Sequence, residues 1–308
     1  MSAAIVKPRA LRLGDTIGVV APAAAVEPAH LERGVAALTA MGYRVKVSGR
    51  ALDRAGILAG TDTSRAAELM AFFADPEVKA IFAARGGYGC GRLLPLLDFA
   101  TIARTPKVFV GYSDETYLLN ALVERVGLVA FHGPMVAMDL ALGLNLAART
   151  HLARLLAGET LPNGLQARTT LRPGTAEGLL IGGCLTVVVA MIGTPWEPLL
   201  DGRILFLEDT GEKAYRIDRM LTQLRQSGAL GRVAGIVFGA IQPADGSTRE
   251  RELIDHFLAE QVADLACPVL AGIEAGHGSE HFTLPMGLRV RLDGARRRLV
   301  FTESAVIT

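Results

Sequence analysis

Residues 107–119 read KVFVGYSDETYLL, an apolar run that passes through Gly111 into a segment with an acidic start and an apolar continuation. This order predicts a buried strand, a tight turn and a helix. Near the start of the chain, the apolar run at 17–21 is followed by an amphipathic segment from about His30 to Met41. Strands that alternate with helices in this way indicate an α/β fold with a parallel sheet that is covered on both faces.

The chain has 308 residues, half of them hydrophobic, which is enough for two domains with sizeable cores. Its strand candidates form two groups, at 17–21, 43–47, 78–84, 108–110 and 128–131, and at 176–181, 204–207, 235–239, 268–271, 288–292 and 298–301. The closing pair predicts a β-hairpin. Residues 140–173 have no strand-like run and contain turn signals. We expect an α/β domain over 1–140, a linker over 141–173 and a second α/β domain over 174–308.

The composition excludes several classes of partner. Thirty-two basic residues balance 31 acidic ones without a Lys/Arg-rich block, which disfavours nucleic acid. Residues 1–7 lack the apolar core of a signal peptide, and no later stretch has eighteen uncharged apolar residues, so export and membrane insertion are not expected. The three cysteines contain no C-x-x-C pair, which fits a reducing cytoplasm and argues against a disulfide framework or a thiolate zinc site.

Ser113 is the first candidate nucleophile, because a serine at a strand-to-helix turn is held outward at the carboxyl edge of the sheet. The backbone N–H of Asp114, in the first helical turn, has no helical acceptor and can serve as an oxyanion donor. The alternative is that Ser113 only caps the helix. An ordinary α/β-hydrolase is disfavoured, because its elbow has glycine where Glu115 stands here.

A glycine-rich turn, AARGGYGCGR at 83–92, directly follows an apolar strand. Its glycines allow a tight turn and close approach to a ligand, and the Gly87 N–H is a candidate second oxyanion donor. A dinucleotide loop would need a small residue at Arg92, and no Walker lysine is present, so phosphate binding is disfavoured. Cys90 is an alternative nucleophile without the strand-to-helix placement. A further alternative is a protein that binds a peptide or nucleotide at this turn without chemistry.

His277 is the candidate general base among six histidines. It lies in EAGHGSEH at 274–281, where flanking glycines leave the imidazole room to move. Glu208 is expected to end the strand at 204–207, and the carboxyl ends of strands are where α/β sites collect. Its carboxylate can hydrogen-bond the imidazole and fix its tautomer. The next acid, Asp209, is expected at the surface.

The same letters spell His277-x-x-Glu280-His281, an inverted zincin motif, so a zinc metallopeptidase is the competing hypothesis. That motif needs both histidines on one helical face. Gly276 and Gly278 flank the first histidine, and both disfavour a helix. We therefore expect no metal.

Seven segments occur along the chain in a fixed order. They are GDTIGVVAP at 14–22, RGGYG at 85–89, GYSD at 111–114, HGPM at 132–135, LED at 207–209, YRIDRML at 215–221 and the region from GH at 276–277 to LPMG at 284–287. Together they resemble the LD-carboxypeptidase family of serine peptidases, over nearly the whole chain.

The resemblance implies a Ser-Glu-His triad of Ser113, Glu208 and His277, the positions that the residues themselves indicated, with the N–H groups of Gly87 and Asp114 as oxyanion hole. It further implies an amidotransferase-like, flavodoxin-like N-terminal domain with the nucleophile and a smaller C-terminal α/β domain with the acid and base. No cofactor is implied, and family members are usually homodimers.

Members of this family typically remove the terminal D-alanine from murein tetrapeptides in cell-wall recycling, which implies that this chain cleaves an L,D-peptide bond. The alternative is the antibiotic-immunity branch, which hydrolyses peptide–nucleotide conjugates. Arg85 and Arg216 are candidates for binding the substrate carboxylate, since a guanidinium matches two oxygens, although either can instead form a structural ion pair. One departure is Cys184, where the family commonly has asparagine.

Overall fold

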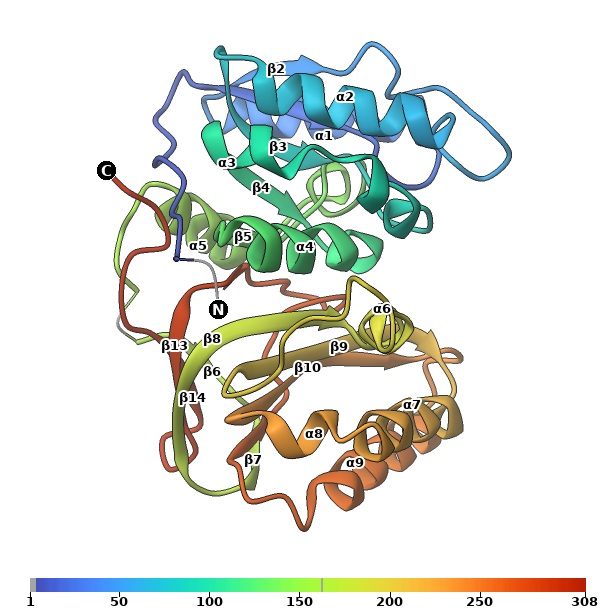
Figure 1. The fold of residues 1–308 in the computed structure, drawn as a ribbon, viewed down its shortest axis with the longest axis vertical. Helices are drawn as coiled ribbons and strands as arrows, with labels where there is room; N and C mark the ends of the chain where they lie inside the picture. The colour runs from blue at the N-terminus through green and yellow to red at the C-terminus, as the bar shows by residue number, and fades with distance from the viewer. Residues whose placement is uncertain (1–3, 162) are drawn as a thin grey trace. The chain divides into compact units, whose positions relative to one another are not determined.

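A computed structural model describes residues 4–161 and 163–308, so Met1–Ala3 of the expected first domain and Pro162 of the expected linker lie outside it. The chain divides into two compact units, which Figure 1 colours mainly blue to green and yellow to red. The first unit runs to Glu159 and includes Thr283–Gly287 and Ser304–Thr308; the second contains Thr160–Phe282 and Leu288–Glu303.

The first unit is built on a six-stranded sheet in the order β12-β5-β4-β3-β1-β2. Its strands are β1 (Thr16–Val20), β2 (Arg44–Val47), β3 (Val78–Ala83), β4 (Val108–Gly111), β5 (Ala130–His132) and β12 (Leu284–Met286). The first five strands are parallel, and β12 pairs antiparallel with β5. The order 2-1-3-4-5 is that of flavodoxin-like sheets. The expected fold class of this part of the chain is therefore confirmed.

Helices of the first unit follow the predicted alternation: α1 (Pro28–Ala40), α2 (Asp62–Ala74), α3 (Phe99–Arg104), α4 (Thr116–Val126) and α5 (Leu146–Leu156). Every residue of the central strand β4 is buried, as expected for a strand covered on both faces. Helix α4 begins only at Thr116, because Ser113–Glu115 form a tighter 3-10 turn. That turn places the candidate nucleophile directly after the strand.

The second unit contains an eight-stranded sheet in the order β6-β14-β13-β8-β9-β10-β11-β7. Its strands are β6 (Leu165–Gln166), β7 (Thr169–Arg172), β8 (Thr175–Cys184), β9 (Ile204–Glu212), β10 (Gly235–Pro243), β11 (Val269–Ala271), β13 (Arg289–Asp293) and β14 (Arg298–Phe301). Strands β8 to β11 are parallel to their neighbours in that series. The antiparallel pair of β13 and β14 confirms the expected hairpin.

Helices of the second unit are α6 (Leu185–Met191), α7 (Ala214–Gln226), α8 (Ala229–Arg232) and α9 (Thr248–Val262). Helix α7 buries Ile217, Leu221 and Leu224, which recur at spacings of four and three and form one apolar stripe. None of the helices within residues 4–161 and 163–308 combines the length and the apolar composition that a bilayer crossing requires.

The prediction that residues 140–173 contain no strand was wrong. The segment holds the edge strands β6 and β7, which pair with β14 and β11. Strand β7, with the sequence TTLR, is half-buried at every position, so it lacks the alternating apolar signal from which strands are predicted. Similarly, β12 lies within the expected C-terminal domain but pairs with a strand of the first unit. These assignments depend on long-range backbone pairing.

Candidate active site

Ser113 follows β4 at a strained turn. Its φ is +65°, a left-handed conformation that costs a residue with a side chain about 1–3 kcal/mol. Such strain at a serine between a strand and a helix is the backbone feature of a nucleophile elbow. Within the described residues, no side-chain capping hydrogen bond begins the 3-10 turn or α4. The geometry therefore favours the nucleophile hypothesis over the helix-cap hypothesis.

Gly86 lies directly against this serine. A Cβ atom on residue 86 would stand 2.9 Å from Cβ and 3.1 Å from Oγ of Ser113. The glycine-rich turn and the serine turn, which are far apart in sequence, therefore share one edge of the first unit. The absence of a side chain at Gly86 leaves space beside the hydroxyl group.

The two acids after Ser113 are buried. Asp114 is buried, and its Oδ2 accepts a hydrogen bond from the Cys90 N–H at 2.7 Å. Burial raises the pKa of Asp114, and the Cys90 N–H opposes that shift. Glu115 is fully buried, and burial, followed by the charge of Asp114, raises its pKa well above the usual range. Both acids face the glycine-rich turn.

The thiol of Cys90 is a poor nucleophile in this environment. Cys90 is fully buried, and desolvation together with the charges of Glu115 and Asp114 raises its pKa well above the ordinary value. Because the thiolate is the reactive form, these neighbours suppress its reactivity. The cysteine-nucleophile alternative is therefore disfavoured.

Gly87 lies at the exposed tip of the turn with a φ of +110°, which favours glycine. A Cβ on this residue would also lie 2.7 Å from that of Ala24. Among the hydrogen bonds within residues 4–161 and 163–308, none uses the Gly87 N–H as donor. This group therefore remains available as an oxyanion donor.

In the second unit, Glu208 and His277 form a hydrogen-bonded pair. Nδ1 of His277 lies 2.7 Å from Oε2 of Glu208, which also accepts the His277 backbone N–H at 3.1 Å. The glutamate side chain is fully buried, and 17% of the histidine side chain is exposed. Because a carboxylate only accepts hydrogen bonds, it places the imidazole proton on Nδ1 and makes Nε2 the basic nitrogen. This is the orientation that a general base requires.

Local irregularity brings this pair together. Glu208 was expected to end its strand, but β9 continues to Glu212; what ends at Glu208 is the pairing with β8, and the register with β10 shifts beside it. The shift lies at Gly239 and Ala240, and the Ala240 N–H donates to the carbonyl of Ala275 at 3.0 Å. Irregularities of this kind often re-aim strands next to active sites.

The contact with Glu208 explains why residue 276, next to the histidine, is glycine. Gly276 has a φ of +94°, and a Cβ there would lie 2.3 Å from Oε2 of Glu208. Any other residue would therefore displace the carboxylate. The sequence signalled the flexibility of this loop but not the close approach, because Glu208 is 69 positions from His277 along the chain.

Asp209 is not a surface acid, contrary to expectation. It is buried, and its Oδ2 accepts hydrogen bonds from the backbone N–H and the hydroxyl of Thr186, at 2.8 and 2.9 Å. Cys184 pairs in register with Glu208, and burial, then the charges of Asp209 and Glu208, raise the pKa of its thiol well above the usual value. Asp209 therefore fixes the start of α6 beside the candidate site.

The inverted zincin hypothesis requires a helix that is not formed. Residues 276–280 are bends, and His281 has a φ of +44°, so His277 and His281 do not share a helical face. Within the part of the chain that the structure describes, no group of three His, Cys, Asp or Glu residues has an arrangement that could hold a metal ion. The loop geometry instead directs His277 to Glu208.

The two candidate carboxylate-binding arginines have different surroundings. Nη1 of the exposed Arg216, on α7, lies 3.2 Å from the carboxylate of Glu212, the last residue of β9. Arg85 is half-buried next to Gly86, and its Nη1 donates to the carbonyl of Ala25 at 3.3 Å. Arg216 therefore forms the structural ion pair that was its alternative role.

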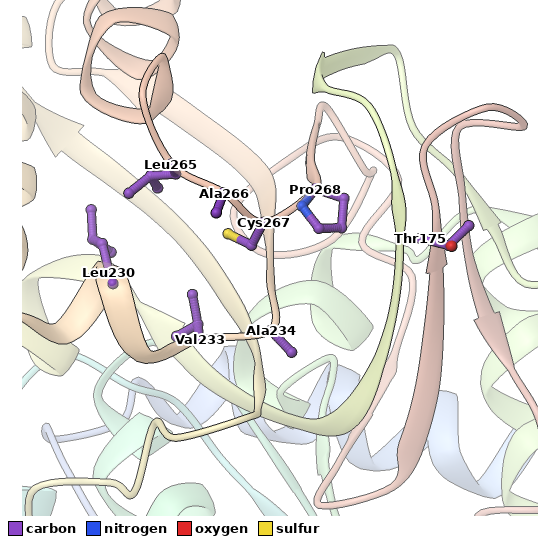
Figure 2. A pocket seen from close by; sticks show the side chains of 9 residues that line it. Thr175, Leu230, Val233, Ala234, Leu265, Ala266, Cys267 and Pro268 are labelled. Carbon is purple, nitrogen blue, oxygen red and sulfur yellow. The ribbon is translucent and has the colours of Figure 1, made fainter.

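A pocket of about 320 Å³ in the second unit, shown in Figure 2, is separate from these residues. Its lining includes Leu230 and Val233, before β10, and Cys267 and Pro268, before β11. These residues lie at the amino ends of two parallel strands, whereas His277 follows the carboxyl end of β11. The pocket therefore lies at the opposite edge of the sheet from the Glu208–His277 pair.

Two family profiles match the chain. The one described as LD-carboxypeptidase N-terminal domain matches residues 17–133, and the one described as LD-carboxypeptidase C-terminal domain matches residues 177–292. The chain therefore belongs to the LD-carboxypeptidase family of serine peptidases, as its ordered motifs predicted.

Named relatives agree with this assignment. The chain is 38% identical to a probable murein peptide carboxypeptidase of Bacillus subtilis, over 96% of this chain and 93% of that protein. It is 29% identical to the microcin C7 self-immunity protein MccF of Escherichia coli, over 97% and 96% of the two chains. The crystal structure of muramoyltetrapeptide carboxypeptidase from Oxalobacter formigenes matches with a TM-score of 0.81 and 33% identity, over 92% of this chain and 97% of that one. These comparisons give no support to a zinc metallopeptidase.

Proposed function

We propose that this protein is a serine carboxypeptidase that cleaves the L,D-peptide bond of murein tetrapeptides and releases the terminal D-alanine during cell-wall recycling. The observation that carries the mechanism is the 2.7 Å hydrogen bond between Glu208 and Nδ1 of His277, because it leaves Nε2 as the base. The names of the Bacillus and Oxalobacter relatives support the class of substrate.

In this mechanism Ser113 Oγ attacks the carbonyl carbon of the residue before D-alanine, and His277 takes the hydroxyl proton. The N–H groups of Gly87 and Asp114 stabilise the oxyanion. His277 then protonates the leaving amine, which departs as D-alanine and leaves an acyl-enzyme. A water molecule, deprotonated by His277, hydrolyses the ester and restores Ser113. Glu208 stabilises the imidazolium in both halves.

We propose that Arg85, in preference to Arg216, binds the substrate carboxylate. Arg85 adjoins Gly86 and Gly87, whereas Arg216 would have to leave its ion pair with Glu212. A guanidinium can hold both oxygens of a terminal carboxylate.

Mass spectrometry of the products from a murein tetrapeptide tests the proposal directly. We expect a tripeptide and free D-alanine, and no cleavage of the same peptide ending in L-alanine. An intact tetrapeptide, or cleavage at an internal bond, would contradict the proposed reaction.

A second candidate substrate is a peptide–nucleotide conjugate, which the similarity to the self-immunity protein favours. The same assay with an aminoacyl sulfamoyl nucleoside distinguishes the two. A kcat/KM for the conjugate well above that for the tetrapeptide would assign the chain to the immunity branch.

Alanine at position 86 is expected to lower kcat by about 10–100-fold, because its Cβ would collide with Ser113 and displace the hydroxyl by a fraction of an ångström. The matched control is Gly49→Ala, where a Cβ meets no atom within 4 Å. Steady-state kinetics of both folded variants provide the measurement. Equal activity of Gly86→Ala and the wild type would show that the contact does not position Ser113.

A chelator titration separates the serine mechanism from the zinc hypothesis. Incubation with excess EDTA, followed by gel filtration, should leave turnover unchanged, because the proposed mechanism involves no metal. Loss of activity that added zinc restores would support the His277/Glu280/His281 site instead.

We also propose a cytoplasmic homodimer without nucleic-acid or membrane partners. Three scattered cysteines support a reducing, cytoplasmic location, and the near-neutral charge argues against a nucleic-acid partner. Analytical ultracentrifugation tests the oligomeric state, and cell fractionation tests the location.

A further inference from the structure

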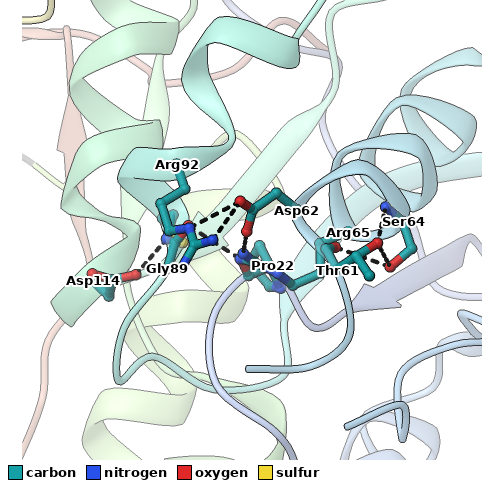
Figure 3. Close-up of polar contacts among 9 residues, drawn as sticks. Pro22, Thr61, Asp62, Ser64, Arg65, Gly89, Arg92 and Asp114 are labelled. Carbon is teal, nitrogen blue, oxygen red and sulfur yellow. Dashed lines mark hydrogen bonds and ion pairs between the residues drawn. The ribbon is translucent and has the colours of Figure 1, made fainter. Parts of the chain in front are cut away.

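The guanidinium of Arg65, on α2, is buried beneath the glycine-rich turn. Only 1% of its side chain is exposed, although arginine is rarely buried without strong partners. Nη1 donates to the carbonyl of Gly89 at 3.1 Å and to that of Pro22, while Nη2 pairs with Asp62 at 2.5 Å (Figure 3). One cation therefore joins the loop after β1 to the loop after β3.

The base of this contact is rigid. Thr61 caps α2, and its side-chain oxygen accepts the Ser64 N–H at 3.1 Å. The Arg65 N–H donates to the Thr61 carbonyl at 3.0 Å, so the arginine side chain projects from the first turn of a capped helix. Asp62 also pairs, at 2.8 Å, with Arg92, the last residue of the glycine-rich turn. Figure 3 shows Arg65 and Arg92 at the Asp62 carboxylate, next to the Thr61–Ser64 cap.

The turn is held from the serine side as well. The Asp114 carboxylate, next to Ser113, accepts the Cys90 N–H at 2.7 Å. The peptide group between Gly89 and Cys90 is therefore held at both ends, with its carbonyl on Arg65 and its N–H on Asp114. Gly89 has a φ of +127°, and a Cβ there would lie 2.8 Å from Nη1 of Arg65, so only glycine allows this approach.

A buried cation is a costly way to tie two loops, since the desolvation of an ion costs several kcal/mol. An apolar side chain would fill the space but would remove the Arg65 donor from the Pro22 carbonyl and leave the Gly89 carbonyl with only the Arg92 N–H, at 3.2 Å. The guanidinium instead fixes the orientation of the two loops, because its planar N–H groups hold the carbonyls of Pro22 and Gly89 at defined angles. The contact lies two residues from Gly87, whose N–H is one of the proposed oxyanion donors.

We propose that Arg65 is a positioning residue, which holds the Gly89–Cys90 peptide group so that the Gly87 N–H is aimed at the oxyanion formed when Ser113 attacks. The inference rests on the proposed function, because it concerns the oxyanion hole of that reaction. Arg65 touches no reacting atom and acts through the backbone of the glycine-rich turn.

The test compares Arg65→Met and Arg65→Lys with the wild-type protein. Arg65→Met should lower kcat by about 10²-fold, with KM changed by less than about threefold, since oxyanion stabilisation acts in the transition state. It should slow the reaction of Ser113 with an organophosphonate by a similar factor, because the phosphoryl oxygen uses the same donors. Arg65→Lys should recover part of both rates.

The matched control is Arg154→Met, an arginine of the same unit that pairs with Glu159 at 2.6 Å but is 49% exposed. Its kinetics should equal those of the wild type. Circular dichroism measures the folded fraction, to which all rates are normalised. Wild-type kcat in folded Arg65→Met, or a loss confined to KM, would overturn the proposal.

If Arg65→Met does not fold, Asp62→Asn tests the same idea by removing the anion that orients Arg65, and its unchanged kcat would be contradictory. Ser113→Ala, measured in parallel, distinguishes a failure of the proposed function from a failure of the proposed role of Arg65. Activity in Ser113→Ala would refute the proposed function itself. An inactive Ser113→Ala beside a fully active Arg65→Met would refute only the role of Arg65.

Discussion

Ser113→Ala should lower kcat for the murein tetrapeptide by about 10⁴-fold or more, because the members of a catalytic triad act as one unit and the remaining groups provide no nucleophile. The fold should survive, since the side chain is partly exposed and makes no capping hydrogen bond that the described residues show. Turnover is measured by D-alanine release, and folding by circular dichroism and Tm.

Ser113→Gly is an informative second variant. The φ of +65° strains any residue with a Cβ, whereas glycine adopts it freely. Ser113→Gly should be as inactive as Ser113→Ala. Its Tm should equal or exceed the Tm of Ser113→Ala. Such a result would show that the native serine is held in a strained conformation for catalysis. Near-wild-type turnover in either purified variant would remove Ser113 from the mechanism.

Glu208→Gln should lower kcat by about 10³–10⁴-fold, with little change in KM. The amide is nearly isosteric, but its NH₂ group can face Nδ1 of His277, which then has to accept a hydrogen bond. The imidazole proton would move to Nε2, the nitrogen that must take the proton of Ser113. The buried carboxylate would also lose its charge-assisted bond to the His277 backbone.

Glu274→Gln is the matched control, because Glu274 is an exposed acid on the same loop as His277. It should keep the wild-type rate, and both variants should have similar thermal unfolding curves. A Glu208→Gln protein with more than about a tenth of wild-type kcat would show that tautomer control is not its role, given the effect expected from a triad acid.

Local sequence patterns predicted many of the strands and helices and the candidate catalytic residues. Apolar runs followed by amphipathic segments identified β1, α1, β4 and α4 to within a few residues, because burial of a strand or helix face is encoded in adjacent positions. The placement of Ser113 between strand and helix followed from the same signal. Glu208 and His277 were selected by residue type and loop position, and the structure pairs them in one unit.

Other features had no local signal. The edge strand β7 and the returning strand β12 are defined by backbone pairing with distant segments. The buried positions of Asp209 and Arg65 depend on partners more than twenty residues away along the chain. Polar residues predict a surface location on average, and only their partners reveal an exception.

The sequence by itself determined the alternation of strands and helices, the family and the three candidate catalytic side chains, because each follows from residue type and spacing. The tertiary structure decided the strained φ of Ser113, the tautomer of His277 and the clamp of Arg65 and Asp114 on the glycine-rich turn. These features arise from contacts between segments far apart in the chain, and the packing that forms them cannot be deduced from local periodicity.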